Sequence, residues 1–304
     1  LALANRLSFF LLVFILGLFI LENISRRKAQ YHTPVKGGFK SKSLIKLNGY
    51  KALTAFLICG TVFFISFLFP VLQMMYWTII FPKHLLDLKI TELFLNTILL
   101  VVLASSVLII FAFISNFGNR VTKSKFLNFL TTFSICGYAI PGVILAVAYI
   151  SFISWFDNNF ISFFEIRSIK SLFIGSIIGL VLVYFVRFYS LASNGIKSGY
   201  LKINYSIDES SYLLGYSKLK TFLNIHVPYL KNSVLLIGIL IAIEIIKELP
   251  ITLILRPFNF ETFATQAYIF ASQDLLEAAA APSLFLIVIA SLFILTTYRY
   301  ILKD

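Results

Sequence analysis

Three charged side chains lie within one apolar stretch of the chain. Glu244, Lys247 and Glu248 follow a run of mostly apolar residues that begins near Ser233. A charge at the centre of a bilayer costs roughly 2.5–3.5 kcal/mol on insertion scales, so such a residue normally faces a bundle interior or a water-filled cavity. Spacings of three and four residues place all three side chains on one face of a helix. The chemistry that this pattern indicates is the passage of an ion or a proton.

The roles of these charges are open to more than one interpretation. Glu244 and Lys247 could neutralise each other and be buried only for helix packing. Alternatively, the face lines a translocation pathway, and the unpaired carboxylate of Glu248 contacts a passing ion. A secondary transporter or channel would use the same three residues as an ion relay. We expect Glu248 to face a pathway and Glu244 to be neutralised mainly by Lys247.

The stretch from Asp208 to Pro228 mixes charged and apolar residues between two long apolar segments. Asp208 and Glu209 suit the positive end of a helix dipole, and Gly215 suits a left-handed position that ends this short helix. Ser217 can cap a second helix that runs to about His226, and Pro228 marks the end of that helix. The pattern therefore predicts a protruding knob of two short helices. Its apolar face is expected at Tyr212, Leu213 and Leu214.

This stretch resembles the EAA loop of the permease subunits of binding-protein-dependent ABC importers. The loop has the pattern Glu-Ala-Ala, three residues, Gly, nine residues, Ile, one residue, Leu-Pro; here two serines replace the alanines and Val227 replaces the leucine. In that family the loop is a cytoplasmic coupling helix that docks on a separate ATPase. An ordinary amphipathic loop lying on the bilayer is the alternative. The coupling residues that the resemblance implies are Asp208, Glu209, Ser210, Ser211, Gly215, Ile225 and Pro228.

A second resemblance covers about twenty residues. The step Lys247-Glu248-Leu249-Pro250, and the stretch from Arg256 to Thr265, are similar to the permeases of ferric-iron importers, with Phe263 in place of the usual Leu. Thiamine and aminophosphonate importers have related permeases, so the substrate stays open between them. The resemblance implies that ferric iron arrives on a periplasmic binding protein. It also implies that Arg256 and Glu261 lie on the face that meets that protein.

The composition is that of a membrane protein. Apolar residues make up 59% of the 304 residues and charged ones 13%, whereas a soluble domain is nearer half apolar and a quarter charged. Several runs exceed the 18 or so apolar residues that span a bilayer. We predict an all-α polytopic bundle of about seven spans, resembling the type I ABC importer permease core. The expected spans are 3–21, 52–80, 93–115, 126–156, 172–189, 233–255 and 282–298.

The net charge of +13 is explained by the placement of the basic residues. If the predicted spans cross the membrane one after another, 19 of the 26 Lys and Arg residues lie on the same side of it. By the positive-inside rule, that side is the cytoplasmic face. The chain is therefore expected to be a multi-pass protein of a bacterial inner membrane, in contact with the lipid bilayer, with a cytoplasmic C-terminus. Nucleic acid is not an expected partner.

The order of the spans suggests three parts. Residues 1–21 form a span that we interpret as the last helix of a missing N-terminal half, 22–51 a basic cytoplasmic linker, and 52–304 a six-span permease domain with a coupling loop at 206–228. A second permease half, fused or separate, is then an expected partner. The stretch 126–156 is too long for one crossing, so Gly137 to Gly142 is expected to divide it. In the permease family a bent helix at this place in the chain lines the translocation pathway. The resemblance therefore implies that Pro141 lies on the pathway.

The sequence shows no catalytic constellation. It has no phosphate-binding P-loop, so ATP hydrolysis is expected in separate cytoplasmic ATPase subunits and the chain is expected to be a transport subunit without a cofactor. Cys59 and Cys136 lie inside apolar spans and have no metal-ligand spacing, and the three histidines are expected at the surface. Asp274 and Glu277 suggest a capping box, whereas Glu261 has no such structural explanation. A GxxxG step at Gly175 and Gly179 suggests close helix packing.

Overall fold

The computed structural model describes residues 46–301 except 87, 123, 135 and 164–172, together with short helical pieces between residues 6 and 21. Of the predicted first span only these short helical pieces are described, and most of the predicted linker at 22–51 lies outside the described residues. Everything regular in the described part is helical. After α2 (Tyr50–Phe63) come a π-turn η1 (Phe64–Leu68), α3 (Phe69–Ile80), α4 (Pro82–Leu86), α5 (Ile90–Thr122), α6 (Lys125–Phe133), α7 (Cys136–Ala139), α8 (Gly142–Phe163), α9 (Ile177–Tyr200), α10 (Tyr205–Leu213), α11 (Lys218–Thr221), a second π-turn η2 (Phe222–His226), α12 (Val227–Ile246), α13 (Pro250–Leu255), α14 (Phe263–Ser272) and α15 (Leu276–Ile301).

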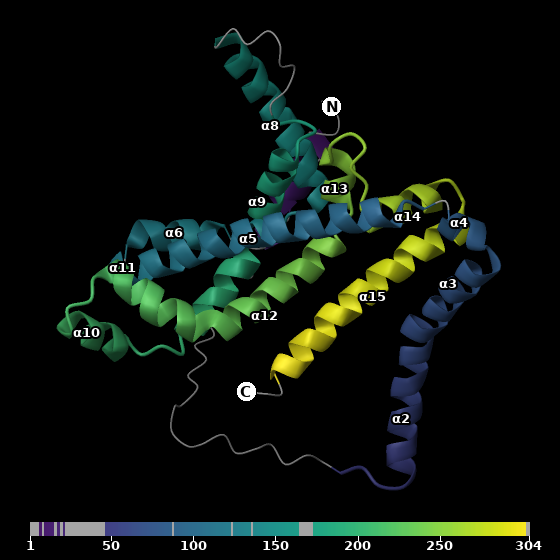
Figure 1. Cartoon of the computed structure of the whole chain (residues 1–304), viewed down its shortest axis with the longest axis horizontal. Helices are drawn as coiled ribbons and strands as arrows, with labels where there is room; N and C mark the ends of the chain where they lie inside the picture. Colours follow the sequence, from purple (N-terminus) through teal and green to yellow (C-terminus); the bar gives the residue numbers. More distant parts are fainter. Residues whose placement is uncertain are drawn as a thin grey trace.

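Helix α5 runs along the length of the molecule and gives it two ends (Figure 1). We call one the α10 end, where α6, α10 and α11 gather, and the other the α14 end, where α4 and α14 lie. With 33 residues, α5 is about 50 Å long and exceeds the roughly 30 Å hydrocarbon core of a bilayer. A helix of this length that crosses the bilayer without strong tilt extends beyond the lipid tails.

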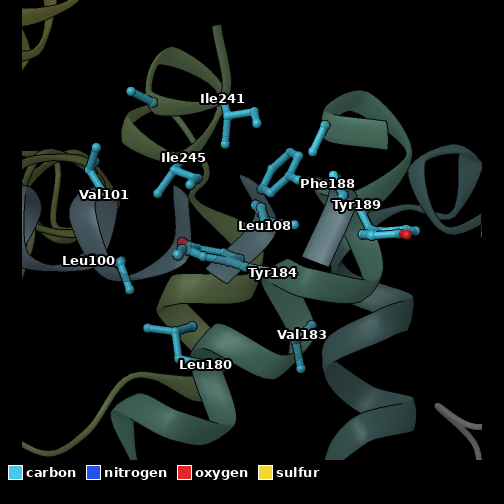
Figure 2. Packing of buried hydrophobic residues seen from close by; sticks show 14 of the residues in the cluster. Leu100, Val101, Leu108, Leu180, Val183, Tyr184, Phe188, Tyr189, Ile241 and Ile245 are labelled. Atoms are coloured by element: carbon cyan, nitrogen blue, oxygen red, sulfur yellow. The ribbon is translucent and has the colours of Figure 1, made fainter. Parts of the chain in front are cut away.

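The core forms where α5, α9 and α12 pack against one another. Figure 2 shows Tyr184 and Leu108 at its centre, with Ile241 and Ile245 beside them. The side chains of Tyr184, Leu108 and Ile241 are fully buried. The three helices are apolar on most sides, which is typical of helices that bury one face against protein and expose the other to lipid.

The described helices confirm the all-α polytopic fold. Five are long and apolar enough to cross a membrane, and the shorter apolar helix Gly142–Asp157 follows the break at Pro141. This break divides the predicted stretch 126–156 into α6, α7 and α8, as expected. The helix from Tyr50 to Ile80 has no buried residue in its most apolar window, and it lies apart from the core in Figure 1.

The prediction that Pro228 ends a short helix was wrong. The helix continues from Lys218 to Ile246 through η2, where the N–H of Val227 bonds to the carbonyl of Phe222, five residues back. A proline has no N–H to donate and its ring clashes with the carbonyl four residues earlier; the wider π-turn relieves that conflict. The same device precedes Pro70, where Phe69 bonds to Phe64.

Close packing of α9 on α12 depends on glycine, although at a different step from the predicted one. Gly175 lies outside the helices with a φ of +67°, whereas Gly195 and Gly199 lie on α9 facing α12. A Cβ on Gly195 would lie 2.6 Å from Cγ1 of Ile237. The GxxxG spacing that brings α9 close to α12 is therefore the one at Gly195 and Gly199. At the predicted step, Gly179 lies close to α8 instead, since a Cβ there would lie 2.5 Å from the hydroxyl of Tyr149.

Gly195→Ala is expected to lower the thermal stability of the purified protein. The added methyl overlaps Ile237, and overpacking of this kind costs about 1–3 kcal/mol. The matched control is Gly118→Ala on α5, where a Cβ would meet only Leu127 at 3.7 Å and alanine favours the helix. Melting temperatures measured in the same detergent should fall for the first variant only. Equal melting temperatures would contradict the close approach of α9 and α12.

Candidate functional site

Residues 205–221 form a projecting knob, but only α10 is a separate short helix as predicted: α11 is the first turn of the helix that continues to Ile246. Helix α10 is followed by Gly215 in the left-handed region, with a φ of 80°, and the hydroxyl of Ser217 caps α11 by accepting a bond from the N–H of Lys220. These two features agree with the prediction. The expected apolar face is exposed, since Leu213 is 90% and Leu214 78% exposed, with Tyr212 beside them at 40%.

A buried carboxylate attaches this knob to the bundle. One oxygen of Asp208 accepts a bond from Nε of Arg120 at 2.7 Å, and the other lies 2.8 Å from Nε2 of His226. All three side chains are buried. Because Arg120 ends α5 and His226 lies in η2, the carboxylate joins α10 to two other helices.

Arg120 also holds the connection between α9 and α10. Its terminal nitrogens donate to the backbone carbonyls of Tyr200 at 3.3 Å, Ile203 at 3.0 Å and Asn204 at 3.2 Å. Its guanidinium lies 4.4 Å from the ring centroid of Tyr205, which adds a cation–π contact. The rigid fork of an arginine side chain suits such multiple bonding. The connection is therefore held by one side chain from α5.

The implied coupling residues divide into two groups. Asp208 and Ser211 are buried, and the Ser211 hydroxyl lies 2.9 Å from that of Thr221 and so ties α10 to α11. The others reach the surface to different degrees: Glu209, Ser210, Gly215 and Pro228 are exposed and Ile225 is half-buried. The first group maintains the shape of the knob, and the second is available to a partner.

The ion pair expected between Glu244 and Lys247 is present, with Nζ of Lys247 2.7 Å from Oε1 of Glu244. The lysine side chain is 62% exposed and the glutamate 22%. Lys247 is the C-cap of α12. This pair is therefore accessible from outside the bundle rather than sealed in its core.

The expectation that Glu248 is unpaired and shares a helix face with Glu244 was wrong. Helix α12 ends at Ile246, because Pro250 cannot continue its hydrogen-bond ladder. The turn carries Glu248 inward, where its side chain is only 8% exposed and lies 3.4 Å from Nε of Arg187 on α9. Glu248 therefore pairs with another helix.

This ion pair joins two helix breaks. A terminal nitrogen of Arg187 donates to the carbonyl of Ile140, just before α8, while Oε1 of Glu248 accepts a bond from the N–H of Ile251 in α13. A Cβ on Gly142 would lie 2.7 Å from that oxygen, so only glycine leaves room for the carboxylate. Pro141, predicted to line a pathway, lies at the same junction. A hydrogen bond between Tyr184 and Thr252 adds a further link from α9 to α13.

Glu261 does have a structural explanation, contrary to the sequence analysis. It forms an ion pair with Arg256 and accepts a bond from the hydroxyl of Thr265 at 2.8 Å. Burial lowers the pKa of Arg256 from its usual value. The capping box in this region belongs to Thr262 and Thr265. Both predicted binding-protein contacts therefore form a local pair at the α14 end.

Asp274 was predicted to form a capping box with Glu277, but it takes a left-handed conformation, with a φ of 59°. Helix α15 begins at Leu276. No group of three His, Cys, Asp or Glu side chains in the described part of the chain could hold a metal ion.

Three residues of the Asp208 and Glu248 ion-pair clusters were not predicted from the sequence. Arg120 and Arg187 were counted as basic flanks of spans, but Arg187 lies in the middle of α9, and His226 was expected at the surface although it is fully buried. The apolar run that resumes after Arg187 was a signal for its position. No local signal pointed to the partners, because the ion pairs join residues far apart in the sequence.

Asp208→Asn is expected to destabilise the protein, because it leaves Arg120 buried without a countercharge. Removing one partner of a buried pair costs about 3–5 kcal/mol. Glu209→Gln, the neighbouring exposed carboxylate, is the matched control and should leave the melting temperature unchanged. Thermal unfolding followed by tryptophan fluorescence measures both. If the Asp208→Asn variant were as stable as the control, the ion pairs of Asp208 would not be needed for the stability of the fold.

Sequence comparison finds one partial relative. No protein-family model matches the chain. The molybdate/tungstate transport system permease protein WtpB of Methanocaldococcus jannaschii is 27% identical over 153 residues. The match covers 50% of this chain and 59% of the relative. The chain thus matches somewhat more than half the length of that protein.

Two solved structures share the fold. A bacterial ABC transporter involved in the import of the acidic polysaccharide alginate matches with a TM-score of 0.63 and 17% identity, over 82% of this chain and 94% of the other. A bacterial alginate ABC transporter in complex with alginate pentasaccharide-bound periplasmic protein matches with a TM-score of 0.65 and 16% identity, over 81% and 92%. The chain therefore has the type I ABC importer permease fold.

Proposed function

We propose that this chain is the membrane-spanning permease of an ATP-driven importer that receives its cargo from a periplasmic binding protein. The observation that carries the proposal is the exposed knob at residues 205–221, held by the buried carboxylate of Asp208. A secondary transporter has no need of a rigid apolar projection between its spans. The partial likeness to the molybdate/tungstate permease supports the same class.

In this proposal the knob transmits force from the ATPase. Leu213 and Leu214 would fill an apolar groove on the ATPase, with Glu209 at its edge. When the ATPase subunits close, they push the knob and switch the pathway from inward-facing to outward-facing. The short bonds of Asp208 to Arg120 and His226 make α5 and η2 move with α10.

The proposed pathway includes Pro141, Glu244, Lys247 and Glu248. The pairing of Glu248 with Arg187 changes how these residues act, because each carboxylate now has its own countercharge. We assign contact with the cargo to the accessible Glu244–Lys247 pair. Glu248 then positions the α12–α13 turn beside the pathway.

Ferric iron is the cargo that we propose, on the resemblance of the 247–250 and 256–265 stretches to iron importer permeases. Iron(III) is a hard cation that prefers oxygen ligands, and Glu244 would offer one. A molybdate-like oxyanion is the second candidate, because the partial relative is named for molybdate and tungstate and Lys247 would attract an anion. Uptake of labelled ferric iron and labelled molybdate by vesicles containing the complete transporter decides between them.

The proposed partners follow from this assignment. Cytoplasmic ATPase subunits would dock at the α10 end, and the periplasmic binding protein would meet the α14 end near Arg256 and Glu261. A second permease half, fused or separate, would complete the pathway in a bacterial inner membrane, with the C-terminus on the cytoplasmic side. Co-purification from native membranes, with identification of an ATPase and a binding protein, tests the whole assembly.

Gly215→Val is expected to weaken ATPase docking without unfolding the permease. No atom lies within 4 Å of a Cβ at this position, so the strain comes only from the positive φ of 80°, which a β-branched residue rarely adopts. Gly215→Asn is the matched control, because asparagine tolerates this conformation. Co-purification of the ATPase should fall with valine and persist with asparagine. Wild-type co-purification of the valine variant would contradict the docking role.

Glu248→Gln is expected to lower both stability and uptake, since it leaves Arg187 without its countercharge in a buried site. The double variant Arg187→Gln/Glu248→Gln removes both charges and should regain most of the melting temperature. Uptake per folded transporter should stay low in the double variant if the pair positions the pathway. Full uptake by the double variant would show that this ion pair serves folding alone.

A further inference from the structure

The α10 end contains a cavity of about 520 Å³ that the proposed transport cycle does not use. It lies between α5, α6 and α9 and the connection that leads to α10, all of which meet at one end of the molecule (Figure 1). Its volume is in the range of small-molecule sites. Its wall is mixed, and the polar side chains among its apolar surface include Asn119, Arg120, Thr131, Asn194, Lys197 and Lys202.

The charge of this wall favours an anion. Arg120, Lys197 and Lys202 line the cavity, and none of the described residues that line it is an Asp or Glu. Lys197 and Lys202 are exposed and form no ion pair with a described Asp or Glu, so their ammonium groups are available for a ligand. Lysine binds phosphate groups as a mobile point charge.

The end of a helix normally repels an anion, because its last carbonyls are unpaired. Here that repulsion is removed. The carbonyls of Lys197 and Gly199 accept bonds from the backbone N–H groups of Leu201 and Lys202. Arg120 occupies the carbonyl of Tyr200 at the end of α9 and those of Ile203 and Asn204 in the connection to α10, and it also neutralises Asp208. The lysines are left as the charges that a ligand in the cavity would meet.

One wall atom lacks a partner among the described residues. The side-chain oxygen of Asn119 is buried and accepts no hydrogen bond from any of them, while its nitrogen donates to the hydroxyl of Thr131 at 3.4 Å. Buried polar atoms nearly always have a partner. A ligand with a hydroxyl group would supply the missing donor, so a ligand with both phosphate oxygens and a hydroxyl would match the whole wall.

We propose that this cavity binds the phosphate ester of a polyol, held by Lys197 and Lys202 through its phosphate and by Asn119 through a hydroxyl. A phospholipid with a glycerol headgroup and a soluble polyol phosphate share this chemistry. Since Arg120 lies on the cavity wall and holds both Asp208 and the 201–204 connection, a bound ligand would stiffen the base of the knob. The cavity would thus be a regulatory site beside the knob.

The test uses the full chain in nanodiscs of phosphatidylcholine, with two probes. Phosphatidylglycerol in the disc represents the lipid source, and glycerol 3-phosphate in solution represents the soluble one. Binding is measured by native mass spectrometry, and hydrogen exchange is measured over residues 201–214. We expect one probe to bind and to slow exchange in this segment. If neither probe binds, the proposal is wrong.

Two double variants distinguish binding in the cavity from nonspecific attraction of the anionic probe to surface lysines. Lys197→Gln/Lys202→Gln should weaken binding about tenfold, in line with the loss of two charge-assisted contacts. Lys51→Gln/Lys231→Gln removes two exposed lysines outside the cavity and should leave binding unchanged.

Asn119→Asp keeps the shape of the wall but adds a negative charge. It should abolish binding and the slowing of hydrogen exchange. If the Lys197/Lys202 variant weakens binding but Asn119→Asp does not, the attraction comes from the surface and the cavity site is refuted. None of these measurements involves an ATPase, so their failure would leave the proposed transport function standing.

Discussion

The arrangement at the α10 end depends on a single carboxylate. Asp208 shares its two oxygens between Arg120 of α5 and His226 of η2, and both contacts are short. A buried charge is costly unless it is paired and hydrogen-bonded, and here both conditions are met. Without this carboxylate, Arg120 would keep only carbonyl partners from the 200–204 segment. The position of α10 relative to the bundle thus follows from one residue in its first turn.

The features that the sequence predicted correctly are local ones. Apolar runs show where helices can cross a bilayer, so α5, α9, α12 and α15 each overlap a predicted span, although α9 extends to Tyr200 and α12 ends at Ile246, well away from the predicted ends at residues 189 and 255. Gly215 and Ser217 were assigned correctly because a left-handed turn and an N-cap each depend on neighbours a few residues away. The break at Pro141 was also predicted correctly, because it too depends on residues nearby in the sequence.

The features that were missed need contacts between distant parts of the chain. Glu248 and Arg187 are far apart in the sequence, and a helical-face argument left Glu248 unpaired beside a Glu244–Lys247 pair. That argument failed because the helix ends before Glu248, at a break set by Pro250. Pro228 gave the opposite error, since the π-turn before it lets the helix continue. A proline in the sequence therefore does not by itself predict whether a helix ends or continues, because the outcome depends on the backbone hydrogen bonds around it.

The two ion-pair clusters are connected through α9. Its end supplies the carbonyl of Tyr200 to Arg120, and thirteen residues earlier, about 20 Å along the helix axis, it supplies Arg187 to Glu248. Between these points α9 is packed on α5 and α12 by fully buried side chains such as Phe188 and Ile196. A packed interior deforms little, so a displacement at the α10 end reaches the α12–α13 turn as a movement of the whole helix. The physical basis for energetic coupling is that α9 is attached by a buried charge at its middle, through Arg187, and at its end, through Arg120. Neither charge can separate from its partner without being left unpaired in an apolar interior.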